Sequence, residues 1–241
     1  MDALFERVRS ELGPLEGDPV PLGGGITNRN YRWGDYVVRV PGAKTDLLGI
    51  DRAGEAAAAR LAAQLGIGPE VAMDEPLVTR FVEGQTLEAP DLRARADEVH
   101  AALARLHDSG ATLPTRFDAL DVVQEYARIA PPPARFERAL ALAVREDYDP
   151  VPCHNDLLPA NFIAAPDGHL VILDWEYAGM GDRRFDLANL AMNAGLETEF
   201  GNAHVLSLLR EAMWGVVQAA NSDIDFDFTA YADEHFARLG V

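Results

Sequence analysis

The sequence predicts an α+β protein with a small, β-rich N-terminal lobe and a larger, mostly helical C-terminal lobe. Short alternating segments interrupted by one alanine-rich helix occupy the first part of the chain, and helical periodicity dominates from Asp91 onward. The pattern changes between Glu83 and Pro90, so residues 1–83 are predicted to form the N-terminal lobe and residues 84–241 the C-terminal lobe. With 241 residues, 48% of them hydrophobic, the chain is long enough for one large domain or two modest ones and has ample hydrophobic content for a packed core.

The N-terminal lobe is predicted to begin with an amphipathic helix from Asp2 to Leu12, which Gly13 and Pro14 end. Leu4, Phe5, Val8 and Leu12 fall on one helical face, as in an amphipathic helix that packs its apolar side. The elements that follow are strands at 31–33 and 36–40 joined by a turn at Gly34 and Asp35, a helix at 52–65, and strands at 70–73 and 77–81.

The C-terminal lobe is predicted to contain several long helices. Helical periodicity covers 91–109, 120–129 and 134–145, and it returns from Phe185 to the end of the chain. Between these helices, residues 151–176 form a compact interruption that carries the densest set of polar side chains. This interruption therefore carries the candidate catalytic residues.

The chain is strongly acidic, with 39 acidic and 21 basic side chains and a formal net charge of −18. A phosphate backbone would meet net repulsion, so nucleic acid is not an expected partner. A small cationic substrate would be attracted, although a generally acidic surface explains the same charge.

Two further features concern the expected compartment. No run approaches the roughly 20 apolar residues needed to cross a bilayer, and the N-terminus lacks the pattern of a signal peptide. Cys153 is the single cysteine, which excludes an internal disulfide; it is expected in a buried strand, although its neighbour His154 also allows a reactive thiol. We therefore expect a cytoplasmic protein without membrane insertion.

Residues 161–174 carry a strong hairpin signal, because two apolar runs flank a Pro-Asp-Gly turn. If residues 166–169 form the turn, Ala165 faces Leu170 and Asn161 faces Asp174. Residues opposed in an antiparallel pair lie about 4.5 to 5.5 Å apart at Cα and share a face of the sheet. Two oxygen-bearing side chains would then converge, as a Mg²⁺ site requires, although an ordinary hairpin also has polar ends.

The run from His154 to Asn161 fits the catalytic-loop pattern HxDxxxxN, with Asp156 at its centre and Asp174 in the position of a second metal-binding residue. On these motifs the chain resembles the choline and ethanolamine kinase branch of the protein-kinase-like fold, which also includes the aminoglycoside phosphotransferase family. The resemblance runs from about Gly23 to Leu239.

The resemblance implies ATP and Mg²⁺ as cofactors. Asp156 would orient the acceptor hydroxyl and accept its proton, and Asn161 with Asp174 would hold the metal. Arg39, paired with Glu55, would steady the phosphates, although Glu55 could also be an exposed helical residue. The residues implied in nucleotide binding are Gly24, Gly25, Thr27 and Asn28 of a glycine-rich loop, Arg39, and Phe81 and Val82 of a hinge, where Phe81 could equally be core.

The resemblance also implies an aromatic and acidic acceptor pocket. Its residues are Asp156, Glu176, Tyr177, Glu211, Trp214 and Tyr231. The chain departs from the family at Glu211, where choline kinases often carry a second tryptophan. It also departs at residues 196–209, a segment shorter than is usual in the family, so the resemblance does not define the pocket wall or any dimer contact there. Asp186 matches a family aspartate that holds loop backbone.

The predicted function is ATP-dependent phosphorylation of a small cationic alcohol, an amino alcohol and most specifically choline. The alternatives are ethanolamine, thiamine or an aminoglycoside as acceptor, which would share every catalytic residue, and a nucleotide-binding pseudokinase without activity. The intact Asp156, Asn161 and Asp174 argue against the pseudokinase. The sequence leaves the oligomeric state open.

Overall fold

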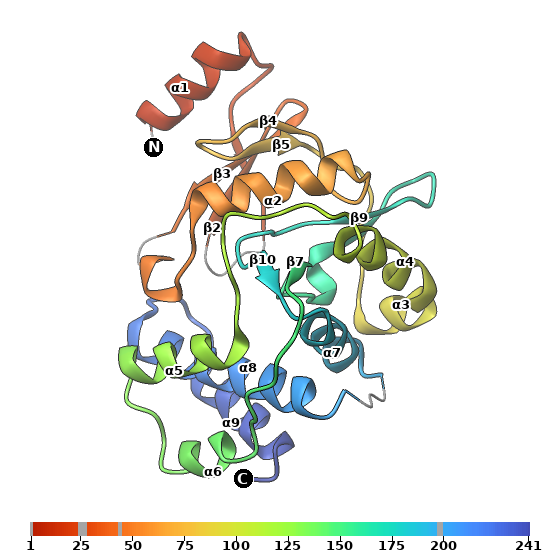
Figure 1. The fold of residues 1–241 in the computed structure, drawn as a ribbon. Helices are drawn as coiled ribbons and strands as arrows, with labels where there is room; N and C mark the ends of the chain where they lie inside the picture. The colour runs from red at the N-terminus through yellow and green to blue at the C-terminus, as the bar shows by residue number, and fades with distance from the viewer. Residues whose placement is uncertain (1, 24–27, 43–44, 197–199) are drawn as a thin grey trace. The chain divides into compact units, whose positions relative to one another are not determined.

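The computed structural model describes residues 2–23, 28–42, 45–196 and 200–241, and Figure 1 shows its elements along the chain. The chain divides into two compact units. The first unit contains Met1–Thr86 and Asn161–Glu176, and the second contains Leu87–Ala160 and Tyr177–Val241. The hairpin that carries Asp174 therefore belongs with the N-terminal strands, and each unit is built from two separate stretches of sequence.

The first unit is a sheet-containing structure with antiparallel strand pairs. One sheet has the order β1-β2-β3-β5-β4, and a second has the order β6-β8-β9. The elements of this unit are α1 (Asp2–Leu12), β1 (Val20–Pro21), β2 (Asn28–Trp33), β3 (Tyr36–Pro41), η1 (Thr45–Leu48), α2 (Arg52–Gln64), β4 (Val71–Met73), β5 (Val78–Arg80), β6 (Gln85–Thr86), β8 (Phe162–Ala164) and β9 (Leu170–Ile172). The predicted hairpin of β2 and β3 is present, with Trp33 paired to Tyr36.

The apolar face of α1 covers a core on the first sheet. Val8 of α1 is fully buried with Trp33, Val38 and Val78 of the strands. Phe5 adds an edge-to-face contact with Trp33, at 5.7 Å between ring centroids. The sequence predicted both this helix and the face that it buries.

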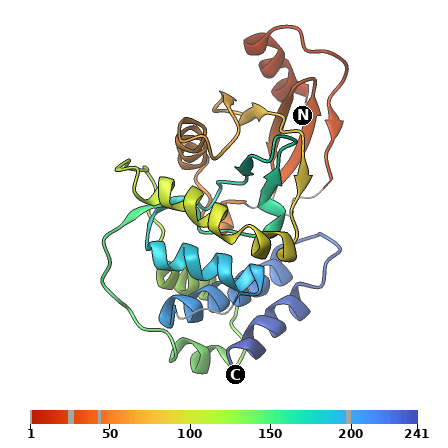
Figure 2. The ribbon, with the colours of Figure 1, turned by 90° about the vertical axis from the view of Figure 1, so that its right-hand side faces the viewer.

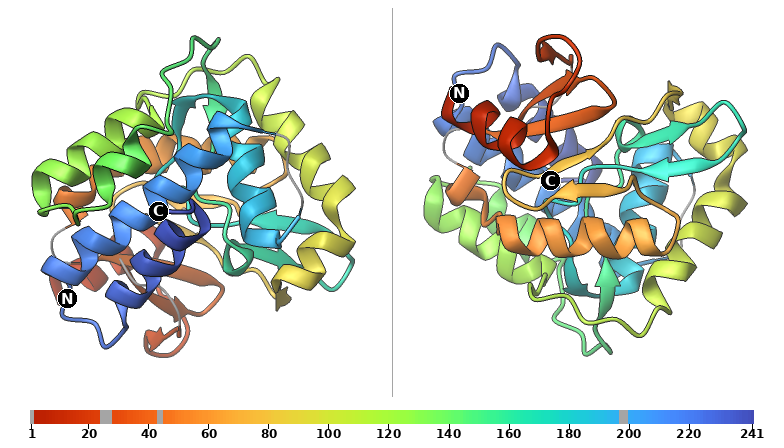
Figure 3. Two further views of the ribbon diagram at one scale, coloured as in Figure 1. Left: turned by 90° about the horizontal axis from the view of Figure 1, so that it is seen from below. Right: turned by 90° about the horizontal axis from the view of Figure 1, so that it is seen from above.

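The alanine-rich helix α2 begins at a defined cap and carries one buried charge. The side chain of Asp51 accepts a hydrogen bond from the Ala53 amide at 3.0 Å, which satisfies a donor that the first turn leaves unpaired. Small alanines on the buried face let the helix lie close to its neighbours, and Figure 3 shows α2 beside β4 in the view from above. Glu55 is buried in this helix at 2% exposure, which excludes the exposed alternative.

The predicted register of the 161–174 hairpin is wrong by one residue. The structure pairs Ala164 with Leu170 and Phe162 with Ile172, and not Ala165 with Leu170. The loop is three residues long, because Ala165 donates to the His169 carbonyl at 2.8 Å and Gly168 adopts φ +86°. A turn followed by a left-handed glycine closes a three-residue hairpin loop, whereas the prediction assumed four residues.

The second unit is mostly helical, as predicted. It contains α3 (Ala89–Ala94), α4 (Ala96–His107), α5 (Ala119–Ile129), α6 (Phe136–Leu140), β7 (Val151–Cys153), β10 (Gly179–Gly181), α7 (Arg183–Ala194), α8 (Asn202–Asn221) and α9 (Phe228–Arg238); the 3-10 turn η2 (Pro159–Asn161) lies where the chain passes to the first unit. Strands β7 and β10 form an antiparallel pair. Figure 2 shows α7 (cyan) beside α8 (blue), and the view from below in Figure 3 shows α8 beside α9.

Two helix predictions need correction. The helix predicted at 134–145 is only the short α6, because Leu142 and Val144 are 45% and 57% exposed and give its continuation no face to bury. The helix predicted at 91–109 is divided at Arg95 into α3 and α4. Cys153 is buried in β7, as expected.

The longest helix, α8, has 20 residues and places most of them inside the second unit. Within the described residues, none of the helices combines the length and the apolar character needed to span a bilayer.

Candidate active site

In the first unit, one guanidinium joins two carboxylates. Arg39 of β3 makes an ion pair with Glu55 of α2, as predicted, and its Nη1 also donates to Asp174 Oδ1 at 2.7 Å. Burial of the guanidinium lowers the pKa of Arg39. The charges of Asp174, Glu55 and Glu176 raise this pKa by a larger amount, so the net shift is upward. Arg39 is therefore a permanent cation that is held in place by its neighbours.

A second arginine extends this group. Arg52, the first residue of α2, donates to Glu55 Oε2 at 2.7 Å and to Asn28 Oδ1 at 2.9 Å. Asn28 in turn donates to Glu176 Oε2 at 2.8 Å. The structure thus brings Asn28 and Glu176 together in the first unit. Glu176, which the sequence assigned to the acceptor pocket, belongs to this cluster.

Asn161 and Asp174 supply the hard oxygen donors that Mg²⁺ prefers. The Asp174 side chain is 25% exposed, whereas that of Glu55 is 1% exposed, so Asp174 is the more accessible of the two carboxylates that bind Arg39. The corrected register sets Leu173 beside Asn161, with the Leu173 amide donating to the Asn161 carbonyl at 2.8 Å. Asp174 then has φ +64°, which takes it out of the strand pleat. The oxygen atoms of Asn161 and Asp174 fit a magnesium ion. The two side chains are not oriented by a shared strand pleat, because Asp174 lies outside it.

The remaining residues predicted to bind nucleotide are only partly described. Gly24, Gly25 and Thr27 lie outside the described residues. Phe81 directly follows β5; its amide donates to the Asp35 carbonyl at 2.8 Å, and the Arg32 guanidinium lies 3.8 Å from its ring centroid. Phe81 and Val82 are both half-buried.

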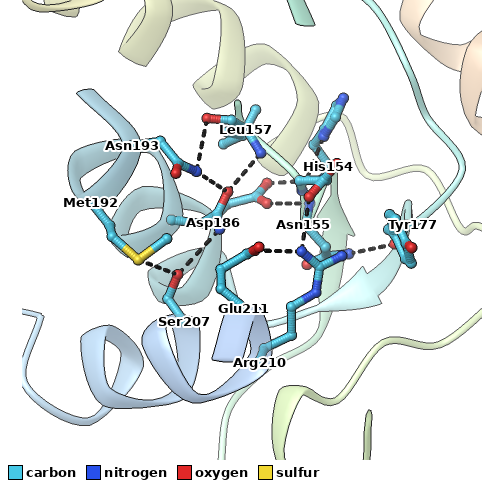
Figure 4. A network of polar contacts seen from close by, with 12 residues as sticks. His154, Asn155, Leu157, Tyr177, Asp186, Met192, Asn193, Ser207, Arg210 and Glu211 are labelled. Carbon is cyan, nitrogen blue, oxygen red and sulfur yellow. Dashed lines mark hydrogen bonds and ion pairs between the residues drawn. The ribbon is translucent and has the colours of Figure 1, made fainter. Parts of the chain in front are cut away.

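In the second unit, Asp186 of α7 holds the backbone of the catalytic-loop motif. It accepts hydrogen bonds from the amides of His154 at 2.9 Å and Asn155 at 2.6 Å (Figure 4). It also lies 2.9 Å from Nε2 of His107. Asn155 has φ +67°, a conformation that non-glycine residues rarely adopt. The predicted role of Asp186 in holding this loop is confirmed.

The other side of the loop is held by Asn189, one turn after Asp186. Its Oδ1 accepts from the Leu157 amide at 2.6 Å, and its Nδ2 donates to Ser207 at 3.2 Å. Asp156 lies between the two anchored amides, and its own amide donates to His154 Nδ1 at 3.2 Å. The position of Asp156 is therefore set from both sides by α7.

His107, Cys153 and Asp186 are a buried group whose ligand atoms lie within 4.8 Å of one another. Burial and the nearby Asp186 charge raise the pKa of the Cys153 thiol, so it stays protonated. The Asp186 carboxylate is already used by the loop amides and by His107. This group is structural.

Asp156 is bound by a cation that the sequence did not single out. Arg210 of α8 donates from Nη1 to Asp156 Oδ1 at 2.9 Å and to Glu211 Oε1 at 2.5 Å. Its guanidinium carbon lies 4.4 Å from the ring centroid of Tyr177, and Figure 4 shows Arg210 between Glu211 and Tyr177. Burial raises the pKa of Glu211, but the Arg210 charge and the hydrogen bond from Tyr231 lower it further, so the net shift is downward.

The aromatic residues predicted to line the acceptor pocket are brought together in part. Trp214 contacts Tyr231 edge to face at 5.6 Å, and Phe228 makes the same kind of contact with Trp214 at 5.6 Å. The Tyr231 hydroxyl donates to Glu211 Oε2 at 2.7 Å. Tyr177 contacts Arg210, so one face of its ring is already occupied by a cation.

Sequence reasoning missed Arg52, Asn189 and, above all, Arg210. The one signal for Arg210 is a charged pair, Arg210–Glu211, inside an apolar run of α8 between Leu208 and Trp214. A charge at a position that the helical period buries needs a partner, which points to a polar site.

Comparison with known proteins gives matches over most of the chain. The profile described as "Phosphotransferase enzyme family" matches residues 18–218. The chain is 29% identical over 199 residues to protein LicA of Haemophilus influenzae; the match covers 73% of this chain but only 58% of that protein.

Solved structures match nearly the whole chain. A choline/ethanolamine kinase family protein from Mesorhizobium loti is 29% identical with a TM-score of 0.74, covering 98% of this chain and 94% of that one. Choline kinase LicA from Streptococcus pneumoniae is 22% identical with a TM-score of 0.79, covering 100% and 97%. These similarities confirm the predicted α+β, kinase-like fold.

Proposed function

Because this chain belongs to the phosphotransferase enzyme family, we propose that it transfers the γ-phosphate of ATP to the hydroxyl of a small amino alcohol. The observation that carries the proposal is the anchored loop around Asp156. Asp186 and Asn189 hold the amides on both sides of this carboxylate, in the spacing HxDxxxxN of a phosphoryl-transfer loop.

Each proposed catalytic residue then has a defined task. Asp156 orients the acceptor hydroxyl and accepts its proton, and Arg39 steadies the phosphates with its permanent charge. Asn161 and Asp174 would hold Mg²⁺, which neutralises the charge of the ATP phosphates when it is bound. Positioning and charge supply the catalysis, because phosphoryl transfer needs little covalent help from the protein.

The acceptor that we propose most specifically is choline. A quaternary ammonium has no N–H group to donate, so aromatic faces and nearby carboxylates are what bind it. Trp214, Tyr231 and Phe228 form such an aromatic group in the second unit, beside Glu211, whose charge is paired with Arg210. Two relatives are named as choline kinases or as choline/ethanolamine kinase family proteins, which supports the same acceptor class.

The test is an assay of ADP release from MgATP with choline, ethanolamine, thiamine and kanamycin as separate acceptors. We expect choline to give the highest kcat/KM, and phosphocholine to be identified as product by mass spectrometry. Activity with thiamine or kanamycin alone would keep the phosphotransferase and reject the amino alcohol. No acceptor-dependent release from a protein that binds MgATP would contradict the proposal.

A further inference from the structure

Arg210 is a charged residue at a position where α8 is otherwise buried. It is 1% exposed, and its Nη1 is shared between Asp156 and Glu211. Its Nε and Nη2 have no hydrogen-bond partner among the described residues. Three residues that the sequence assigned to the acceptor, Asp156, Glu211 and Tyr177, thus bind this guanidinium.

A cationic alcohol presents a problem to an enzyme whose base is a carboxylate. The acceptor has two ends, a hydroxyl and an ammonium, and the proposed base Asp156 carries a negative charge. In a buried setting, charge attracts the ammonium to that carboxylate more strongly than a hydrogen bond attracts the hydroxyl. The acceptor would then bind in the inverted direction, with its hydroxyl away from the base, and no transfer would follow.

We propose that Arg210 is a positioning residue that prevents this inverted binding. The inference rests on the proposed function. By occupying Asp156 and Glu211 with a fixed cation, Arg210 repels the ammonium from the base and leaves the oxygen end of the acceptor as the group that approaches Asp156. The ammonium is thereby directed to the aromatic contacts of Trp214 and Tyr231.

The hydrogen-bonding capacity of Arg210 supports the same direction. Its two nitrogens without a partner, Nε and Nη2, are donors, and a buried donor is satisfied by an oxygen atom but not by an ammonium. The hydroxyl end of the acceptor has oxygen lone pairs, and its quaternary end has none. Burial lowers the pKa of Arg210, but the charges of Glu211 and Asp156 raise it further, so the cation persists at any working pH.

Steady-state kinetics distinguish inverted binding from other defects. Inverted binding traps enzyme in an unproductive complex, so it lowers kcat and KM for choline together and leaves kcat/KM almost unchanged. For Arg210→Met we expect kcat and KM to fall about tenfold each, with kcat/KM within about threefold of wild type. Arg210→Lys keeps a cation and should restore both values to within about threefold.

A neutral acceptor provides the matched substrate control. In 3,3-dimethylbutan-1-ol a carbon replaces the choline nitrogen, so shape is kept and charge is removed. Arg210→Met should lower kcat for this alcohol at least about threefold less than it lowers kcat for choline, because the alcohol has no ammonium to bind Asp156. Equal losses with choline and with the neutral alcohol would overturn the inference, as would a KM for choline that rises while kcat stays constant.

A double variant tests the inference in case Arg210→Met does not fold. Arg210→Met leaves two buried carboxylates without their cation, and such a break can unfold a protein. The double variant Arg210→Met with Glu211→Met replaces the buried pair by apolar side chains, which is often tolerated. It leaves Asp156 exposed to the ammonium, so the joint fall of kcat and KM for choline should reappear. A double variant with wild-type kcat would overturn the inference.

A binding measurement decides the inference even if the proposed function fails. Tetramethylammonium has no hydroxyl, and calorimetry gives its affinity without turnover. We expect Arg210→Met, or the double variant if the single one does not fold, to bind it at least about tenfold more tightly than wild type. Wild type that phosphorylates no amino alcohol would reject the proposed function alone. Variants that bind tetramethylammonium no better than wild type would reject the role of Arg210.

Discussion

Arg39 and Asp174, 135 residues apart in the sequence, are joined by a hydrogen bond of 2.7 Å between Nη1 and Oδ1. Arg39 comes from β3, and Asp174 follows β9, so the bond connects the two sheets of the first unit. The cation proposed for the phosphates and the carboxylate proposed for the metal are therefore positioned together.

Asp174→Ala should abolish Mg²⁺-dependent binding of nucleotide, because it removes the only charged ligand proposed for the metal. Asn161→Ala should weaken binding less, since it removes a neutral oxygen. The measurement is calorimetric titration with a non-hydrolysable ATP analogue, with and without Mg²⁺. Asp167→Ala, in the exposed turn of the same hairpin, is the control and should bind as wild type does. Unchanged affinity in both site variants would remove these residues from the metal site.

Asp156→Asn should lower kcat by about a hundredfold or more, because general-base catalysis typically contributes 10² to 10⁴. The amide keeps the shape of the side chain, so nucleotide affinity should stay close to wild type. The melting temperature should fall, because buried Arg210 loses one of its two carboxylate partners and keeps only Glu211. Asp149→Asn, at an exposed position, is the matched control. Near-normal turnover with an unaltered pH profile would show that Asp156 is not the base.

Asp186→Ala should destabilise the protein by about 3 kcal/mol or more, because it orphans two buried amides and His107, and each unsatisfied group costs about 1 to 3 kcal/mol. It should also lower kcat by releasing the loop around Asp156. Asp186→Asn keeps one acceptor oxygen and should lose less in both respects. Urea unfolding and turnover, measured on the same preparations, test the two losses; full activity in a destabilised Asp186→Ala protein would separate the loop from catalysis.

The lowered pKa of Glu211 predicts that the free energy of unfolding depends on pH. Its pKa in the folded protein lies below the ordinary value, chiefly because the Arg210 charge and the Tyr231 hydroxyl outweigh burial. A depressed carboxyl pKa contributes stability that is present above the unfolded pKa and is lost as the pH falls through the folded pKa. Glu211→Gln should therefore be less stable than wild type at pH 7, and the difference should shrink in acid. Urea unfolding between pH 7 and pH 3 checks this; a constant difference would contradict it.

Choline should be phosphorylated with kcat/KM at least about tenfold above ethanolamine, a difference of about 1.4 kcal/mol. Aromatic faces attract both cations, but they leave the N–H groups of ethanolamine without acceptors. Trp214→Ala should remove most of this margin, whereas Trp214→Phe should keep part of it. The measurement is kcat/KM for both acceptors with each variant. A Trp214→Ala enzyme with the full margin would place the ammonium elsewhere.

The sequence predicted features that depend on local pattern. The helix Asp2–Leu12, the β2–β3 hairpin and the loop motif around Asp156 all follow from periodicity or spacing, and the structure contains them. The hairpin register depended on the length of the loop at Gly168, which the sequence pattern did not determine. Because the loop is one residue shorter than predicted, every residue pair of the hairpin is shifted by one position. The helix predicted at 134–145 is too long because periodicity alone does not show whether an apolar face packs against another element.

Arg210 was beyond sequence reasoning for a different reason. Its position in α8 says that it is buried, but its partners Asp156 and Tyr177 come from loops 54 and 33 residues earlier in the chain. A contact of this kind depends on tertiary packing and has no local signature. The same holds for Asp186, whose role in the loop came from family resemblance and not from its neighbours.

The division of the chain into units also limits which segments related enzymes can exchange by recombination. Because the first unit combines residues 1–86 with residues 161–176, a recombination event with one crossover near residue 86 would transfer β3 and α2 without the hairpin that bears Asp174. Arg39 of one parent would then face the aspartate of another. A chimera that inherits the first unit intact needs junctions at residues 86, 160 and 176. Recombination among relatives should therefore favour sequence exchanges within the second unit, which carries the proposed acceptor residues, because such exchanges leave the first unit intact.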